Sequence, residues 1–145
     1  MTKISTESAE GDRLSPPGAA SQQAMPQMKI KLTLKDQTRA AKLIDSRSAR
    51  DFLSLLPLTL TMNDLFQREK FAHLPRALST KGKHTHSYAL CDIASWPPGP
   101  DIAIFYHHDG ERIPDPGIIV IGKIAGGLHA IGTAGAVKVT IQSAK

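Results

Sequence analysis

Strict alternation between apolar and polar residues is the feature that most constrains what this chain can fold into. It is clearest in MKIKLTL (28–34), LTLTM (58–62) and AVKVTIQ (136–142), where every second side chain is apolar. A period of two places the apolar side chains on one face of an extended strand and the polar ones on the other. Such strands are stable only when their apolar faces pack together, so we predict a mostly β fold.

Further strands lie between these three segments. TRAAKLI (38–44) follows the turn KDQ and is expected to return as the second strand of a hairpin. DIAIFYHH (101–108) and the apolar part of GIIVIGKIAGGLHAI (117–131) are predicted as strands, and SWPPGP (95–100) as a stiff turn. Residues 63–92 are less regular, and no strand is predicted there.

One clear helix is predicted, over DSRSARDFLSLLP (45–57). Its apolar residues recur at helical spacing, Ser48 and Asp51 fit an N-terminal capping box, and Pro57 ends it. A second, short helix is expected at LHAI (128–131), after the paired glycines.

The order of these elements favours a barrel. Roughly seven strands occur in runs instead of alternating with helices, which is typical of a closed, mostly antiparallel barrel with helices capping its open ends. We expect this domain to cover residues 28–145. Residues 1–27 contain almost nothing large and apolar, so they cannot offset their own ordering entropy and are predicted to form a flexible N-terminal tail.

Composition limits the class of protein and its compartment. The single cysteine, Cys91, fits a reducing environment and is interpreted as a small buried residue rather than a thiol nucleophile. Neither a signal peptide nor a membrane-spanning apolar run is visible, so a cytoplasmic protein without a membrane partner is predicted. The net charge of +5 comes from basic residues scattered singly, and aromatics make up only 5% of the chain, so we predict no nucleic-acid interface.

The glycines of GIIVIGKIAGGLHAI raise the question of a phosphate site. A phosphate-binding loop places its lysine after the last glycine, or follows a G-x-G-x-x-G pattern. Here Gly122 and Lys123 precede Gly126 and Gly127, and neither pattern is met. We therefore interpret Gly122 as a point where the strand bends or another backbone approaches it, and the glycine pair as a turn. No cofactor is predicted.

Histidines offer an alternative site. On a strand His84 and His86 would share a face, and they would form a zinc site if they met His107, His108 and Asp109. Their spacing matches no metal-binding motif, so solvated loop histidines without a metal are the favoured interpretation.

Several of these segments resemble parts of the cyclophilins. GIIVIGKIAGGLHAI resembles the cyclophilin segment H-V-V-F-G-K-V with its following glycine and helical turn, and DIAIFYHH resembles the strand S-Q-F-F-I. More closely, ARDFLSLLPLTLTMND, LPRALST and IAIFY are similar to a group of small bacterial cyclophilin-like proteins. The resemblance spans residues 28–145 and implies a cyclophilin-like closed antiparallel barrel.

Cyclophilins catalyse prolyl isomerisation with an arginine directed at the twisting amide, beside a pocket rich in phenylalanine. By this resemblance, FAHLPR makes Arg76 the candidate catalytic residue. Its spacing departs from the F-H-R motif, and the Q-G-G-D segment is absent from residues 77–95. The resemblance therefore implies a module that binds a peptide or a small molecule without the full isomerase site. An active prolyl isomerase using Arg76 is the alternative.

The implied groove would be lined by aromatic and histidine side chains. Because side chains alternate along a strand, only one of Phe105 and Tyr106 is expected to face it. The predicted groove residues are Phe71, His73, Trp96, Phe105 and Tyr106. Neither the ligand nor the oligomeric state follows from the sequence.

Overall fold

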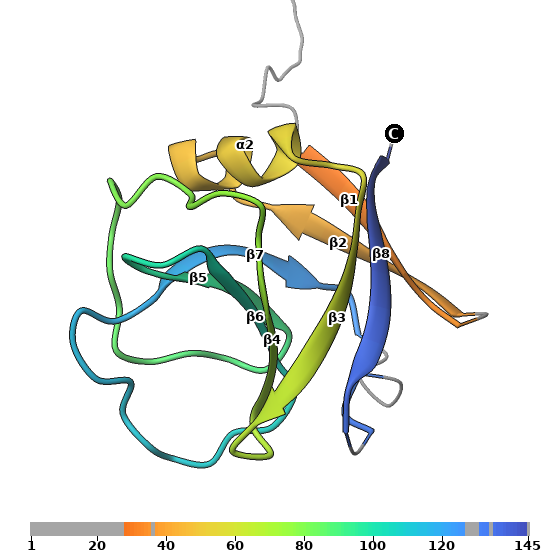
Figure 1. Ribbon diagram of the computed structural model, residues 1–145. Coiled ribbons are helices and arrows are strands. Elements are labelled where there is room, and N and C mark those ends of the chain that lie inside the picture. The colour runs from red at the N-terminus through yellow and green to blue at the C-terminus, as the bar shows by residue number, and fades with distance from the viewer. Residues whose placement is uncertain (1–27, 36, 127–130, 134, 145) are drawn as a thin grey trace, which may run out of the picture.

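The chain forms a closed β-barrel (Figure 1). The computed structural model describes residues 28–35, 37–126, 131–133 and 135–144. Within these ranges the strands pair in the order β1-β2-β7-β5-β6-β4-β3-β8, and all pairs are antiparallel. The prediction of a mostly β, closed antiparallel barrel is confirmed. The strands are β1 (Met28–Leu34), β2 (Gln37–Leu43), β3 (Leu58–Leu65), β4 (Glu69–His73), β5 (Asp92–Trp96), β6 (Asp101–Phe105), β7 (Ile119–Ile124) and β8 (Val137–Ala144).

The alternation in the sequence sets which face of each strand is buried. In β1, Ile30, Leu32 and Leu34 are at most 4% exposed, whereas Lys29 and Lys31 face solvent. β1 pairs with β2 along its whole length and with β8 on its other side. Aliphatic side chains from these strands therefore fill the barrel interior, as expected for a small barrel. The predicted N-terminal tail, residues 1–27, lies outside the described residues.

Closure of the barrel depends on a close approach between β2 and β7. A Cβ at Gly122 would lie 2.6 Å from the Lys42 carbonyl oxygen and 2.8 Å from Leu43 Cδ2. The prediction that another backbone approaches Gly122 is confirmed. The two strands share the pairs Ala41–Ile124, Lys42–Lys123 and Leu43–Gly122.

The paired glycines beyond β7 are described only in part. Gly126 has a φ of +141°, which a side chain rarely adopts and which suits glycine at a turn. Gly127 and residues 128–130 of the predicted short helix lie outside the described residues.

Helix α2 (Arg47–Ser54) packs at one end of the barrel (Figure 1). Ala49 and Phe52 are fully buried, which explains the helical spacing of the apolar residues. The predicted capping box is wrong, because Ser46 is the N-cap and its Oγ accepts a bond from Ala49 N at 3.2 Å. Within the described ranges, no helix is both long and apolar enough to cross a membrane.

Ser48 and Asp51 have a different task from capping. Ser48 Oγ donates to the Ser79 carbonyl oxygen at 2.7 Å, and Ser79 N donates to the Asp51 carboxylate at 2.8 Å. These two bonds fasten the segment after β4 to the helix. Ser48 and Asp51 therefore form tertiary hydrogen bonds with Ser79, although their spacing is that of a capping box.

Two strands, β4 and β5, lie where the sequence predicts none. Both bury polar side chains: Glu69 and Lys70 in β4, and Asp92 and Ser95 in β5. A search for alternating apolar residues cannot find a strand that is polar on a buried face. The strand predicted at 101–108 is also shorter than expected, since β6 ends at Phe105.

Candidate functional site

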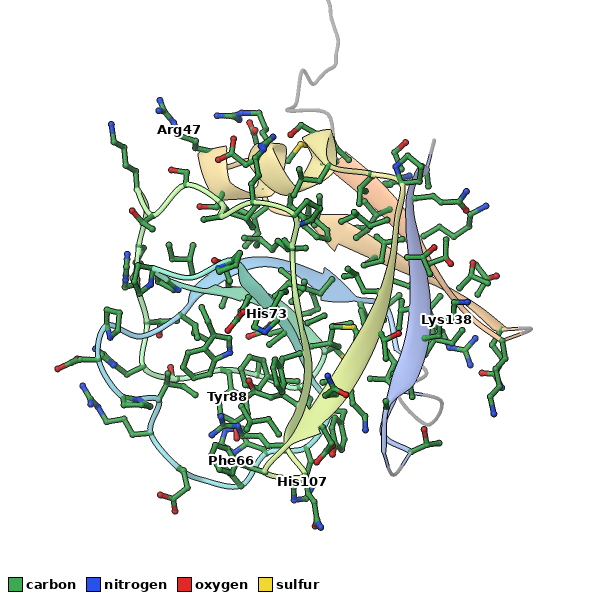
Figure 2. The ribbon with its side chains drawn as sticks, viewed as in Figure 1. Arg47, Phe66, His73, Tyr88, His107 and Lys138 are labelled. Atoms are coloured by element: carbon green, nitrogen blue, oxygen red, sulfur yellow. The ribbon has the colours of Figure 1, made fainter. Side chains whose placement is uncertain are left out.

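A hollow of about 790 Å³ opens on the barrel beside β4, β5 and β6. Its apolar lining includes Phe66 in the turn after β3, Phe71 on β4 and Trp96 at the end of β5. Phe66 is 72% exposed, which is unusual for so large an apolar side chain. Figure 2 shows Phe66 and Tyr88 on the same side of the barrel. We call this hollow the Trp96 pocket.

The turn between β3 and β4 positions two residues of the pocket. Phe66 and Gln67 both have positive φ, 59° and 52°, and Arg68 N donates to the Leu65 carbonyl oxygen at 3.1 Å. This is the geometry of a tight hairpin turn that follows the twist of the strands. The turn leaves Phe66 exposed, whereas Arg68 is buried.

A buried ion pair lies beneath the pocket. Arg68 Nε and Nη2 lie 2.7 Å and 2.6 Å from the same oxygen, Oε2 of Glu69. The other oxygen, Oε1, accepts a bond from Trp96 Nε1 at 2.9 Å. The Arg68 side chain is 5% exposed and that of Glu69 is fully buried. The pair therefore fixes both the guanidinium and the indole ring at the pocket.

Aromatic rings surround the Arg68 guanidinium. Its Cζ lies 5.3 Å from the ring centre of Phe66, 5.6 Å from that of Tyr88 and 5.7 Å from that of Phe105. Tyr88 and Phe105 are stacked on each other with ring centres 4.3 Å apart. These contacts are within the range of cation–π attraction, so they add to the ordering of the guanidinium.

The pKa values of two carboxyl groups near Arg68 shift in opposite directions. Burial raises the pKa of Glu69, and the charge and hydrogen bond of Arg68 oppose that rise. The pKa of Asp109 is lowered chiefly by the bond from the Glu111 backbone N–H, with further help from Tyr88. Asp109 Oδ1 accepts the Tyr88 hydroxyl at 2.8 Å, and its Oδ2 lies 3.7 Å from Arg68 Nη1.

The structure brings three of the predicted groove residues together. Phe71 and Trp96 line the Trp96 pocket. His73 lies at its margin, 72% exposed, with its ring edge-on to Phe71 at 6.2 Å between ring centres and its Nδ1 paired with Asp101. Phe105 is fully buried beneath Arg68, and Tyr106 lines a different hollow.

Arg76, the candidate catalytic residue, lies apart from this group. Its Nη2 donates to Ser54 Oγ at 2.7 Å, on the last residue of α2. The side chain does not line the Trp96 pocket. The arginine that does lie beside the aromatic side chains is Arg68, which precedes Phe71 in the chain.

Comparison with known proteins places the chain in a family. A sequence model described as the cyclophilin-like family matches residues 32–142. The chain belongs to the cyclophilin-like family. Its fold is also similar to the solution structure of a hypothetical protein from Archaeoglobus fulgidus, with a TM-score of 0.66 and 21% identity, over 81% of this chain and 95% of that one. No curated protein sequence matches the chain.

A second, smaller hollow of this cyclophilin-like barrel surrounds Tyr106, with a volume of about 440 Å³. The Tyr106 hydroxyl donates to Asp64, and burial followed by the Asp64 contact raises the pKa of Tyr106 to about 12. Lys70 Nζ, fully buried, donates to the carbonyl oxygens of Thr133 and Gly135 at 2.6 Å and 2.5 Å. Because Tyr106 is bonded to Asp64 and Lys70 to two carbonyl oxygens, these three side chains offer a ligand fewer free partners than the Trp96 pocket does.

Phe66, Arg68 and Glu69 have little sequence signal of their own. They lie in FQREK (66–70), a run that is typical of an exposed turn. The one signal in the sequence is that Arg68 and Glu69 come just before the candidate Phe71. That position does not distinguish a buried ion pair from two exposed charges.

The histidines considered as metal ligands contact different partners. His86 Nδ1 faces the Ile113 carbonyl oxygen at 2.9 Å, and its Nε2 lies 3.2 Å from Asp115. His108 stacks on Tyr88 at 4.5 Å between ring centres, and His107 lines the Tyr106 hollow. Among the described residues, no group of three or more potential metal ligands comes together.

His84 fastens the loop before β7 to the segment after β4. Its Nδ1 lies 2.9 Å from the Pro116 carbonyl oxygen and its Nε2 lies 3.0 Å from that of Thr80. Carbonyl oxygens only accept, so both contacts are hydrogen bonds only when the ring is protonated. The Thr80 contact, followed by the Pro116 contact, raises the pKa of His84 above 6.5.

Replacing His84 with alanine is therefore expected to cost more stability in acid than in base. A raised pKa in the folded state gives stability that is fully present below pH 6.5 and is lost as the pH rises through the folded value. Thermal unfolding of both proteins at about pH 5.5 and about pH 8.5 measures the difference. An equal cost at the two pH values would contradict this role for His84.

Proposed function

We propose that this cyclophilin-like chain is a binding module that takes a peptide or a small molecule in the Trp96 pocket. The observation that carries the proposal is an apolar hollow, with Phe66 left 72% exposed, above a fixed charged pair. Ligand sites are typically concave, mostly apolar and equipped with a few well-placed polar groups. A ligand that covers the Phe66 ring explains why so large an apolar side chain is left exposed.

The walls of the pocket suit a ligand with flat or ring-shaped apolar groups. Phe71 and Trp96 are half-buried, so they present apolar surface without being free to reorient. Trp96 Nε1 is already bonded to Glu69. The indole therefore serves as an apolar surface for the ligand, and the polar contacts of the site fall to other groups.

Trp96 is the only tryptophan of the sequence, so its fluorescence reports on the pocket directly. We expect acetylated peptides with aromatic or proline residues, or small aromatic compounds, to shift its emission in a saturable way. Phe66→Ala should weaken the response, because it removes the exposed wall. Leu90→Ala, which removes another exposed apolar side chain outside the pocket, should leave it unchanged. A panel of such probes that leaves Trp96 emission unchanged would contradict the proposal.

The alternative function is prolyl isomerisation with Arg76 as the catalytic residue. A protease-coupled assay on a proline tetrapeptide compares the native protein with Arg76→Ala. We expect Arg76→Ala to leave ligand binding unchanged, since its guanidinium is bonded to Ser54 at the helix. Acceleration by the native protein that Arg76→Ala abolishes would favour the isomerase and overturn our choice.

A further inference from the structure

Arg68 has hydrogen-bond donors that the described residues do not use. Its Nε and Nη2 are both directed at one oxygen of Glu69. No acceptor among the described residues lies within hydrogen-bonding distance of its Nη1. Asp109 Oδ2, which forms an ion pair with it, is 3.7 Å away. The side chain is nevertheless only 5% exposed and lines the Trp96 pocket.

Unused donors on a buried guanidinium are costly, because a buried polar group without a partner loses its water and gains nothing in return. Glu69 occupies the side of the guanidinium formed by Nε and Nη2. The end formed by Nη1 and Nη2 is the one that matches the two oxygens of a carboxylate. The geometry therefore calls for an oxygen-bearing ligand at this end.

The lining of the pocket carries charges of both signs. Asp101 is paired with His73, and Asp109 accepts the Tyr88 hydroxyl and the Glu111 backbone N–H. Arg112 also lines the pocket and has no recorded ion pair among the described residues. Asp109 and Glu111 are exposed carboxylates on the same lining. Because the lining charges are mixed, it is the open donor end of the fixed Arg68 guanidinium, with Arg112 at the rim, that favours an anionic oxygen ligand over a cation.

We infer that the Trp96 pocket takes ligands with an apolar body and a terminal carboxylate, which binds to Nη1 and Nη2 of Arg68. The inference rests on the proposed binding function and adds the chemical class of the ligand. The apolar body lies against Phe66, Phe71 and Trp96. A peptide C-terminus and a small organic acid carry the same group, and the test separates them.

The direct test compares matched acids and amides on the native protein. The probes are 3-phenylpropanoate and 3-phenylpropanamide, and an acetylated phenylalanine-ended tetrapeptide as free acid and as C-terminal amide. Trp96 fluorescence gives the affinities. We expect each acid that binds to do so roughly tenfold more tightly than its amide, the gain expected for a charge-assisted pair. The pair that binds more tightly identifies the source of the carboxylate.

Two outcomes separate this inference from the proposed function. If acid and amide bind equally well, the carboxylate inference is wrong and the binding module stands. If none of the four probes binds, the carboxylate inference is overturned, and the proposal that the Trp96 pocket binds a ligand loses its support. Arg68→Lys keeps the charge facing Glu69 but removes the forked donor, so it should reduce the difference between acid and amide.

Asp109→Asn provides a test that keeps the Arg68 side chain itself. The amide oxygen still accepts from the Tyr88 hydroxyl and the Glu111 N–H, but the negative charge 3.7 Å from Arg68 Nη1 is gone. We expect the acid to bind severalfold more tightly and the amide to be unaffected. Weaker binding of the acid in this variant would show that Asp109 does not compete for Arg68 and would overturn the inference.

Discussion

Replacing Arg68 with alanine is expected to lower the free energy of unfolding by about 3–5 kcal/mol, the cost of breaking a buried ion pair. The substitution leaves the Glu69 carboxylate fully buried without the cation that balances it. It also removes the contacts of the guanidinium with Phe66, Tyr88 and Phe105. Chemical denaturation of both proteins measures the loss.

The double variant Arg68→Met with Glu69→Gln is the matched control. It removes both charges together, and the glutamine oxygen still accepts the bond from Trp96 Nε1. Replacing both members of a buried pair is often close to neutral, so most of the lost stability should return. A cost below about 1 kcal/mol for the single variant is typical of an exposed pair and would contradict burial of Arg68 and Glu69.

Replacing Gly122 with alanine is expected to destabilise the barrel by about 2–3 kcal/mol, as for other cases of overpacking. The added Cβ would lie 2.6 Å from the Lys42 carbonyl oxygen, and a backbone atom in a paired strand cannot move aside cheaply. The strain falls on the junction of β2 and β7, which closes the barrel.

Gly99→Ala is the matched control for Gly122→Ala. The closest atom to its Cβ would be the Trp96 carbonyl oxygen at 3.9 Å, which is an ordinary contact. We expect its cost to stay within about 0.5 kcal/mol, as for other unhindered surface positions. Thermal unfolding of the two variants side by side decides the matter, and equal costs would mean that β2 and β7 are not packed as described.

The strands that bury one apolar face were predictable from the sequence, and those that bury charge were not. Alternation in MKIKLTL places Ile30, Leu32 and Leu34 inside, as observed. In β4 the residues Glu69 and Lys70 are buried because partners from other elements neutralise or bond them. The hydrogen-bond partners Trp96, Thr133 and Gly135 lie 27 to 65 positions away in the chain, and nothing in the local pattern shows that the adjacent Arg68 is buried with Glu69.

The candidate site was likewise predictable only in part from the sequence. Phe71 was predicted as a groove residue from the resemblance of FAHLPR to the cyclophilin motif, and Trp96 from its place in the stiff turn SWPPGP; both line the pocket. The resemblance to cyclophilins directs attention to Arg76, the arginine after Phe71. The arginine beside the aromatic side chains is Arg68, and its place depends on burial with Glu69 and on the turn that exposes Phe66.

The most direct test of the account is to map where a ligand binds. In nuclear magnetic resonance spectra of the isotope-labelled protein, titration with 3-phenylpropanoate should shift the indole N–H of Trp96 and the Nε–H of Arg68 most, with Phe66 and Arg112 next. The residues around Tyr106 and His107 should change little, because they line the other hollow. Shifts concentrated at Tyr106 and His107, or none at Trp96, would contradict the assignment of the Trp96 pocket as the binding site.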